Sequence, residues 1–380
     1  MTETWDAGAI AARYELDEST AATLARYGFD VVTFDRLREE LAADGLDEKR
    51  NWVDGEVRSP SPDDLRALPG TGDPDRAALE AAGEAAILAG EVGVLLLAGG
   101  MATRFGGGVK ALAEVVPGHR FVDVKLADLV SLTDRLGARV PMVLMTSFQS
   151  DAVLGQVGQE LGSESVPVHI APQAISMRVT EQGELFRTSD GAVSLYAPGH
   201  GDVPLALQTS GVLEQFRESG GKHLFITNVD NAAATLDPAV IGLHLAGGTQ
   251  MTCEVTGGSL SGGAPYFVDG HLQILEEFRI PAHVDTKAPL AVNTNSMVID
   301  AEALAADHPL TWFQVQKKVD GEPVVQFERL VGELSAFVTT TMAVVERDGV
   351  DGRFQPVKDP AELEQRRPEI QRILEARGVI

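Results

Sequence analysis

Three short apolar runs occur in the middle of the chain, and each ends in small or polar residues. They are VGVLLLAGG (92–100), PMVLMTSF (141–148) and HLFITNVDN (223–231), with helical candidates between them at 121–137 and 205–221. Strands that alternate with helices at this spacing predict right-handed βαβ units. Because both faces of such a sheet are covered, its strands are apolar throughout. The pattern therefore predicts an α/β fold with a Rossmann-like, mixed but mostly parallel central sheet flanked by helices.

Both ends of the chain show helical patterns. Apolar residues such as Leu24, Leu37 and Leu41 recur at roughly helical spacing, and an Ala-rich segment follows a turn-rich link. We predict a helical N-terminal segment (1–90), a central domain (91–345) and a short C-terminal segment (346–380) with a terminal helix from Pro360. Further strands are expected at 251–259, 271–281 and 291–299.

The charge of the chain limits its partners. With 56 acidic against 31 basic residues, the formal net charge is −25, whereas nucleic acid and anionic membranes are bound by clustered lysines and arginines. We therefore expect neither partner. Cys253 is the only cysteine, which excludes an intramolecular disulfide and a thiolate metal cage. The first residues resemble no secretion signal, and no apolar stretch is long enough to span a membrane, so we expect a soluble, cytoplasmic protein.

A glycine-rich loop follows the first apolar run directly. Residues 95–112 read LLLAGGMATRFGGGVKAL, with Arg104 and Lys110 among the glycines. Neither the P-loop pattern nor the dinucleotide pattern G-x-G-x-x-G occurs in it. Small residues at the carboxyl end of a parallel strand let a ligand approach the backbone, and the two cations can bind a polyphosphate. The alternative interpretation is a glycine turn with solvated cations.

The loop resembles the LAGG-x-x-T-R-x-G…K loop of sugar-nucleotide pyrophosphorylases, and the resemblance covers about residues 90–360. It is closest to the UDP-glucose pyrophosphorylase branch. It implies a nucleotidyltransferase fold of the GT-A type, with residues 91–345 as the catalytic domain. The other segments that resemble family motifs are PMVLMTSFQSD (141–151), APGHGDV (197–203), FITNVDNAAATLDP (225–238), LQILEEFRIP (272–281), VNTNSMVI (292–299), QFERLVGELSAF (326–337) and FQPVK (354–358).

The resemblance also implies a reaction and its catalytic residues. In the family, an oxygen of a sugar 1-phosphate attacks the α-phosphorus of a nucleoside triphosphate and pyrophosphate leaves. Asp230 would hold Mg²⁺, although an aspartate at this place can also cap a turn. Arg104, Lys110 and Lys358 match the family cations that contact the phosphates. The implied substrates are UTP and a hexose 1-phosphate, with glucose 1-phosphate as the first candidate.

Further matched residues would form the nucleotide and sugar sites. Gln173 matches the family glutamine that reads the uracil edge, while without the resemblance a buried structural amide is equally reasonable. We assign no proton transfer to His200, since a histidine between glycines is more often a hydrogen-bonding residue than a base. The nucleotide site would comprise Leu97, Ala98, Gly99, Gly100, Gln173 and Gly199, and the sugar site His200, Gly201, Asn228, Glu276, Asn293 and Asn295.

Some residues depart from the family pattern near these sites. The segment Ser261-Gly262-Gly263 begins with serine where the family often has lysine, and Lys287 is a candidate replacement. Ala102 stands where many members have glycine, and Met177 where proline is common. A second interpretation is therefore a nucleotidyltransferase for an unusual sugar or cyclitol 1-phosphate in a specialised pathway, with GTP as a candidate nucleotide beside UTP. A third is a catalytically silent nucleotide-binding module.

The short stretch after Lys358 leaves no room for the β-helical C-terminal domain of eukaryotic relatives, so we expect a monomer or a small homo-oligomer.

Overall fold

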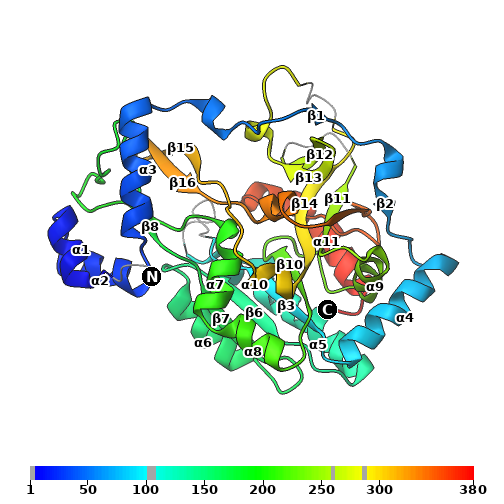
Figure 1. Ribbon diagram of the computed structural model, residues 1–380. Coiled ribbons are helices and arrows are strands. Elements are labelled where there is room, and N and C mark those ends of the chain that lie inside the picture. Colours follow the sequence, from blue (N-terminus) through cyan, green and yellow to red (C-terminus); the bar gives the residue numbers. More distant parts are fainter. Residues whose placement is uncertain (1–4, 101–107, 258–261, 285–288) are drawn as a thin grey trace.

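The computed structural model describes residues 5–100, 108–257, 262–284 and 289–380, and an eight-stranded sheet lies at its centre (Figure 1). All neighbouring strands are parallel except at β14, which runs antiparallel to both β10 and β11. The predicted mixed, mostly parallel sheet is confirmed. In spatial order the strands are β2 (Arg66–Ala67), β17 (Thr340–Val344), β11 (Met251–Thr256), β14 (Val292–Asp300), β10 (His223–Asn228), β3 (Val92–Leu97), β6 (Met142–Thr146) and β7 (Val168–Pro172).

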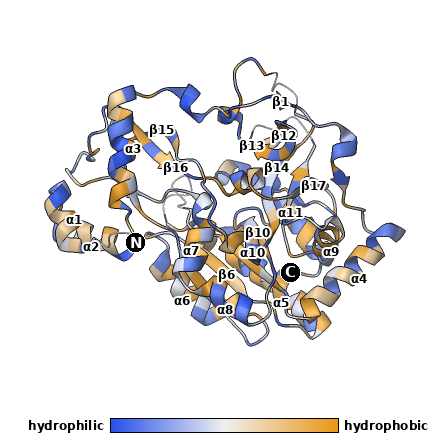
Figure 2. Cartoon of the chain, in the orientation of Figure 1, coloured by the Kyte–Doolittle hydropathy of each residue, from blue (hydrophilic) through white to orange (hydrophobic). Residues whose placement is uncertain are grey.

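Helices cover both faces of this sheet. Along β3, Val94 and Leu96 pack into one hydrophobic core and Leu95 into the other, which is the period of two expected for a strand buried on both sides. In Figure 2 the central strands β6 and β10 are coloured mainly as hydrophobic. The first core includes residues of α4 (Pro74–Leu88), α5 (Phe121–Leu136), α6 (Asp151–Leu161), α9 (Pro238–Gly247) and α11 (Pro360–Ala376), and the second includes residues of α7 (Val203–Thr209), α8 (Val212–Glu218), α10 (Ala301–Ala305) and the 3-10 helix η7 (Val331–Ala336).

The helix expected at 205–221 is interrupted. It consists of α7 and α8, and Gly211 between them has a φ of 73° and serves as the N-cap of α8. A left-handed residue cannot continue a right-handed helix, and glycine adopts this conformation at little cost. The helix expected at 121–137 and the terminal helix are confirmed as α5 and α11.

Three helices form the beginning of the N-terminal segment, namely α1 (Ala7–Tyr14), α2 (Glu18–Arg26) and α3 (Val31–Asp44). Each is capped by an aspartate side chain that accepts a backbone N–H of the first turn, which satisfies a donor that the helix leaves free. They pack in a third core with residues such as Ile175, Val325 and Phe327. The segment is not helical throughout, because residues 57–58 and 66–67 pair with strands from the second half of the chain.

A hairpin of β15 (Phe313–Val319) and β16 (Glu322–Glu328) adds to the predicted elements. Asp320 and Gly321 between them have positive φ values of 53° and 87°, as tight hairpin turns require.

The strand expected at 271–281 ends early, at Leu275, and a 3-10 turn follows. The predicted boundaries at residues 90 and 345 stay predictions. The remaining elements are η1 (Glu48–Asn51), β1 (Val57–Arg58), η2 (Pro62–Asp64), η4 (Lys110–Leu112), β4 (Glu114–Val116), β5 (His119–Arg120), β8 (Ser176–Met177), β9 (Leu195–Tyr196), η5 (His200–Asp202), β12 (Ala264–Val268), β13 (His271–Leu275) and η6 (Glu277–Arg279).

Within the described residues, the helices are too short or too polar to cross a membrane.

Candidate nucleotide and sugar site

A cavity of about 300 Å³ lies at the carboxyl edge of β3, β6 and β10. This is the edge at which open α/β sheets bind ligands. Ala98 is buried beneath the cavity, and its N–H donates to the Met145 carbonyl at 2.9 Å. Arg104 lies outside the described residues. The lining consists of Leu97, Gly99, Gly100, Lys110, Met145, Gln173, Ala197, Gly199, His200, Asn228, Val229 and Asp230.

The antiparallel direction of β14 brings further polar residues to the same edge. Ile226 of β10 pairs with Met297 of β14, so the beginning of β14 lies beside the end of β10. There the Asn295 side chain donates from Nδ2 to Asn228 Oδ1 at 2.9 Å, and the Asn295 N–H donates to Asn293 Oδ1 at 3.1 Å. The structure thus joins three residues of the predicted sugar site, although Asn228 alone of the three lines the cavity.

Gln173 is held at the start of the loop after β7. Its N–H donates to the Thr146 carbonyl at 3.0 Å, and its side-chain amide packs so closely on Gly99 that a Cβ there would lie 2.2 Å from Nε2. Any residue other than glycine at position 99 would displace this amide. Gln173 Oε1 is buried and has no hydrogen-bond partner in the described part of the chain. A buried acceptor without a partner costs free energy unless a ligand satisfies it.

His200 lines the cavity as a neutral imidazole. Burial lowers its pKa to about 4, and its Nδ1 accepts the Val331 N–H at 3.0 Å. The proton of the neutral ring is therefore on Nε2, which makes that atom a hydrogen-bond donor. Gly201 has a packing role instead, because a Cβ there would lie 2.3 Å from the Arg329 carbonyl carbon, and it is absent from the lining residues.

Lys110 and Asp230 form an ion pair at the cavity, with Nζ 2.5 Å from Oδ2. Lys110 begins η4 and Asp230 follows β10, so each is set by an element end. The Asp230 carbonyl accepts the Val357 N–H at 3.3 Å, which brings the chain around Lys358 next to the site. The Lys358 side chain is exposed and is not part of the cavity lining.

Glu276 belongs to a separate cluster around Gly263. Burial raises the pKa of the Glu276 carboxyl, although it accepts the Gly263 N–H. The Gly263 carbonyl accepts the Asn293 N–H at 2.7 Å. Glu276 and Asn293 are thus connected, but neither lines the described cavity. Ala102 and Ser261, which depart from the family pattern, and the candidate replacement Lys287 lie outside the described residues.

Lys125 is a site-supporting residue that the sequence reasoning missed. Its buried Nζ donates to the Asn231 carbonyl at 2.5 Å and to the Ala234 carbonyl, and so fixes the loop directly after Asp230. Burial lowers its pKa to about 7. The sequence does indicate that Lys125 is buried, because it lies four positions from both Phe121 and Leu129 and so on the apolar face of this helix.

Asp202 and Arg329 form a second missed support. The Asp202 carboxylate is fully buried, accepts the Ala174 N–H at 3.1 Å and pairs with the Arg329 guanidinium. Arg329 in turn accepts the Gly201 N–H with its carbonyl at 2.9 Å. This ion pair therefore connects the segment directly after Gln173 with the segment that carries His200.

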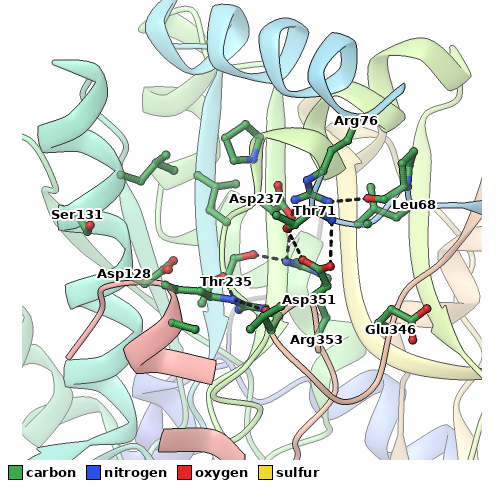
Figure 3. Close-up of a pocket in the computed structure, with 18 of the residues that line it drawn as sticks. Leu68, Thr71, Arg76, Asp128, Ser131, Thr235, Asp237, Glu346, Asp351 and Arg353 are labelled. Carbon is green, nitrogen blue, oxygen red and sulfur yellow. Dashed lines mark hydrogen bonds and ion pairs between the residues drawn. The ribbon is translucent and has the colours of Figure 1, made fainter. Parts of the chain in front are cut away.

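A larger cavity, of about 450 Å³, is lined in part by Thr235 and Asp237, which follow Asp230 in the chain (Figure 3). Its arginines donate to protein acceptors. Arg76 binds Glu80, the Pro69 carbonyl and Asp237. Arg353 binds Glu254 and the Thr235 carbonyl, and Arg377 binds the Ala233 and Gly352 carbonyls. Since these guanidinium groups already have partners, they offer little to an anionic ligand.

Comparison with known proteins relates this geometry to a family. A family model described as UTP–glucose-1-phosphate uridylyltransferase matches residues 38–367. The chain belongs to this family. The barley (Hordeum vulgare) enzyme of that name is 30% identical over 292 residues, which are 71% of this chain and 60% of that protein. The UTP–glucose-1-phosphate uridylyltransferase 2 of Dictyostelium discoideum is 29% identical over 298 residues, which are 73% of this chain and 58% of that protein. The chain thus spans about three fifths of the length of these members of the uridylyltransferase family.

Solved structures show the same fold. UDP-N-acetylglucosamine pyrophosphorylase from Trypanosoma brucei superposes with a TM-score of 0.74 at 21% identity, over 92% of this chain and 79% of that one. A variant of UDP-glucose pyrophosphorylase from Leishmania major, solved in complex with UDP-glucose, superposes with a TM-score of 0.66 at 23% identity. The match covers 95% of this chain and 78% of that one. The expected nucleotidyltransferase fold is confirmed.

Proposed function

We propose that this protein is a Mg²⁺-dependent nucleotidyltransferase that forms a UDP-sugar and pyrophosphate from UTP and a hexose 1-phosphate, with glucose 1-phosphate as the first candidate. The observation that carries the proposal is the meeting of Lys110, Asp230 and Gln173 in one cavity. A cation, a carboxylate and an amide that can read a base lie together there. Membership of the uridylyltransferase family supports the same reaction. The proposal includes a cytoplasmic protein that is a monomer or a small homo-oligomer.

The base is assigned to the Gln173 side of the cavity. An amide can donate from Nε2 to a ring carbonyl and accept a ring N–H on Oε1, and uracil presents this pair. Such binding would satisfy the buried Oε1 that has no partner in the described residues. The close packing of Gly99 against the amide favours a compact pyrimidine over a purine.

The sugar is assigned to the side of His200 and Asn228. The neutral His200 ring offers an Nε2 donor, and the Asn228 amide is held by its bond with Asn295. These groups can bind sugar hydroxyls, and none of them carries a charge that would compete for the phosphate. Hydroxyl recognition by amides and an imidazole suits a neutral hexose ring.

The reaction forms one bond and breaks another. A phosphate oxygen of the sugar attacks the α-phosphorus, and the bond from this phosphorus to its bridging oxygen breaks, so the electron pair leaves with pyrophosphate. Lys110, which lines the cavity, would neutralise the charge that grows on the leaving group. By resemblance, Arg104 and Lys358 would add to this neutralisation. Catalysis of this kind depends on positioning and charge, without a covalent intermediate.

The donor set at the cavity fits Mg²⁺. Asp230 offers a carboxylate whose Oδ1 has no partner in the described ranges, and Mg²⁺ typically takes one or two carboxylates together with phosphate oxygens and water. Asp230 would hold the ion and Lys110 would then be free to contact a phosphate. When bound, the ion supplies positive charge at the phosphates of the nucleotide.

The test is a substrate matrix with the purified chain. UTP, GTP, ATP and CTP are each combined with the 1-phosphates of glucose, galactose, N-acetylglucosamine and myo-inositol, and pyrophosphate release is measured with Mg²⁺ present. UTP with a hexose 1-phosphate should give the highest kcat/KM, and mass spectrometry should identify the UDP-sugar. Preference for GTP or for the cyclitol phosphate would overturn the substrate assignment. Nucleotide binding without pyrophosphate release in all sixteen combinations would overturn the enzymatic one.

A further inference from the structure

Two histidines and an aspartate meet at the end of β10 and β14 that lies farthest from the nucleotide cavity. His223 begins β10 and Asp300 ends β14, and the two residues are register partners. His223 Nδ1 lies 2.7 Å from Asp300 Oδ1, and His244 Nε2, from α9, lies 3.0 Å from the same oxygen. In the described residues, this is the one group of three such side chains whose ligand atoms all lie within 4.8 Å of one another.

The surroundings of the three side chains resemble those of a metal site. His244 is 2% exposed, whereas His223 and Asp300 are 12% and 28% exposed, so the group is largely buried but remains partly accessible to solvent. The outer nitrogen of His244, Nδ1, lies 2.9 Å from Thr252 Oγ1. An outer hydrogen bond of this kind fixes the orientation of a metal-binding imidazole.

The two contacts to Asp300 are close to the separations that a bound ion requires. Zn²⁺ binds imidazole nitrogen and carboxylate oxygen at roughly 2.0–2.2 Å in tetrahedral geometry, which separates neighbouring ligand atoms by about 3.3 Å. The two contacts to Asp300 are shorter than this by a few tenths of an ångström. Both histidines converge on Oδ1, while Asp300 Oδ2 has no partner in the described part of the chain.

We propose that His223, His244 and Asp300 bind a transition-metal ion, with Zn²⁺ as the principal candidate and water at the open position. Imidazole together with carboxylate suits Zn²⁺, whereas Mg²⁺ prefers oxygen ligands alone. The ion would join two strands and one helix.

This site is distinct from the nucleotide cavity. His223 precedes Asp230 by seven positions along β10 and the turn after it, and an extended strand rises about 3.3 Å per residue, so the two sites are roughly 20 Å apart. The role that follows is structural. An ion that binds only the folded state stabilises it according to its concentration relative to its dissociation constant.

The test uses the full chain after chelator treatment and dialysis, titrated with ZnCl₂ by calorimetry and followed by thermal unfolding. We expect one equivalent to bind in the micromolar range or tighter and to raise Tm by several degrees. Co²⁺ should give visible absorption bands typical of four-coordinate nitrogen and oxygen ligands. His223→Gln and Asp300→Asn, which change the partly exposed ligands, should each weaken Zn²⁺ binding at least tenfold.

Two variants serve as controls. His119→Gln removes a histidine outside the cluster, and Asp230→Asn removes the proposed Mg²⁺ ligand at the nucleotide cavity. Both should bind Zn²⁺ as the unmodified chain does. Absence of binding, or binding that His223→Gln and Asp300→Asn leave unchanged, would show that the three residues are a hydrogen-bonded triad only. A loss of binding confined to Asp230→Asn would place the ion at the nucleotide cavity and overturn the proposal.

Discussion

The two principal cavities of this protein differ in what their polar groups have left to offer. In the larger cavity, of about 450 Å³, Arg76, Arg353 and Arg377 donate to carboxylates and carbonyls of the protein. In the smaller one, of about 300 Å³, Gln173 Oε1 lacks a partner in the described chain, and Asp230 is paired through one oxygen. The guanidinium groups of the larger cavity are therefore already bound by the protein, whereas the smaller cavity offers an amide oxygen and a carboxylate oxygen to a ligand.

Replacing Asp230 tests this difference most severely. Asp230→Asn should lower kcat by on the order of 10³, as removal of a preorganised charge contact does, while the fold stays intact by circular dichroism. Asp128→Asn, which removes a carboxylate that lines the larger cavity, is the matched control and should keep kcat within about twofold. Equal losses in the two variants would erase the distinction between the cavities.

Lys110, which lines the smaller cavity, and Lys358, which lies next to it in the chain that contacts Asp230, should show the next largest effect. Lys110→Ala and Lys358→Ala should each lower kcat/KM by about 10², since each variant lacks one cation that would stabilise the negative charge of the leaving pyrophosphate. Because Lys358 is exposed, the Lys358→Ala variant should keep the Tm of the unmodified chain. The Tm of Lys110→Ala should fall only slightly. Parallel losses of Tm and activity would instead make these lysines structural.

Gln173 should govern the choice of base. Gln173→Ala should reduce the preference for UTP over CTP by at least tenfold, because a site built to hydrogen-bond one base edge rejects others through unpaired polar groups. The measurement is kcat/KM for both nucleotides in the variant and in the unmodified chain. An unchanged ratio would mean that the base binds elsewhere.

Lys125→Met should destabilise the chain by about 2 kcal/mol, since two buried carbonyls lose their donor. The loss should depend on pH. The pKa of Lys125 is lowered to about 7 in the folded chain, so between pH 7 and about 10 the unfolded chain binds more protons at this residue, and stability rises with pH. Urea unfolding at pH 7 and pH 9 should show a larger difference between the unmodified chain and the variant at pH 9.

The smallest effect is expected at Asp128, and its sign is opposite. Burial raises the pKa of Asp128 to about 6, above the value of about 3.9 in unfolded chains, so its charge lowers stability as pH rises from 4 to 6. Asp128→Asn should therefore raise Tm by a few degrees at pH 7.5 and by less at pH 4.5. Asp134→Asn, at an exposed position of the same helix, should change Tm at neither pH.

The sequence predicted those parts of the fold and site that depend on local patterns. The strand before Gly99 and the polar residues after β10 were visible because apolar runs end there. The hairpin at Asp320 and Gly321 was missed although an Asp-Gly pair between alternating residues is a strong hairpin signal.

Other features have no local pattern to indicate them. The antiparallel entry of β14 brings Asn295 to Asn228 through pairing between distant segments. Lys125 binds carbonyl oxygens of Asn231 and Ala234, and since every residue has a carbonyl, the identity of those partners carries no signal.

The hydrogen bonds around Arg353 and Arg377 have a consequence for biosynthesis. The donor to the Thr235 carbonyl, Arg353, is synthesised 118 residues after it, and the donor to the Ala233 carbonyl, Arg377, is synthesised 144 residues after it. At about 5–20 residues per second, a ribosome needs roughly 6 to 29 s to supply these partners. The parallel strands β3 and β6 can pair long before that, whereas the Thr235 and Ala233 carbonyls lack these donors until Arg353 and Arg377 have been synthesised. A nascent chain halted before Arg353 therefore lacks both side-chain donors that hold the Thr235 and Ala233 carbonyls in the segment after Asp230.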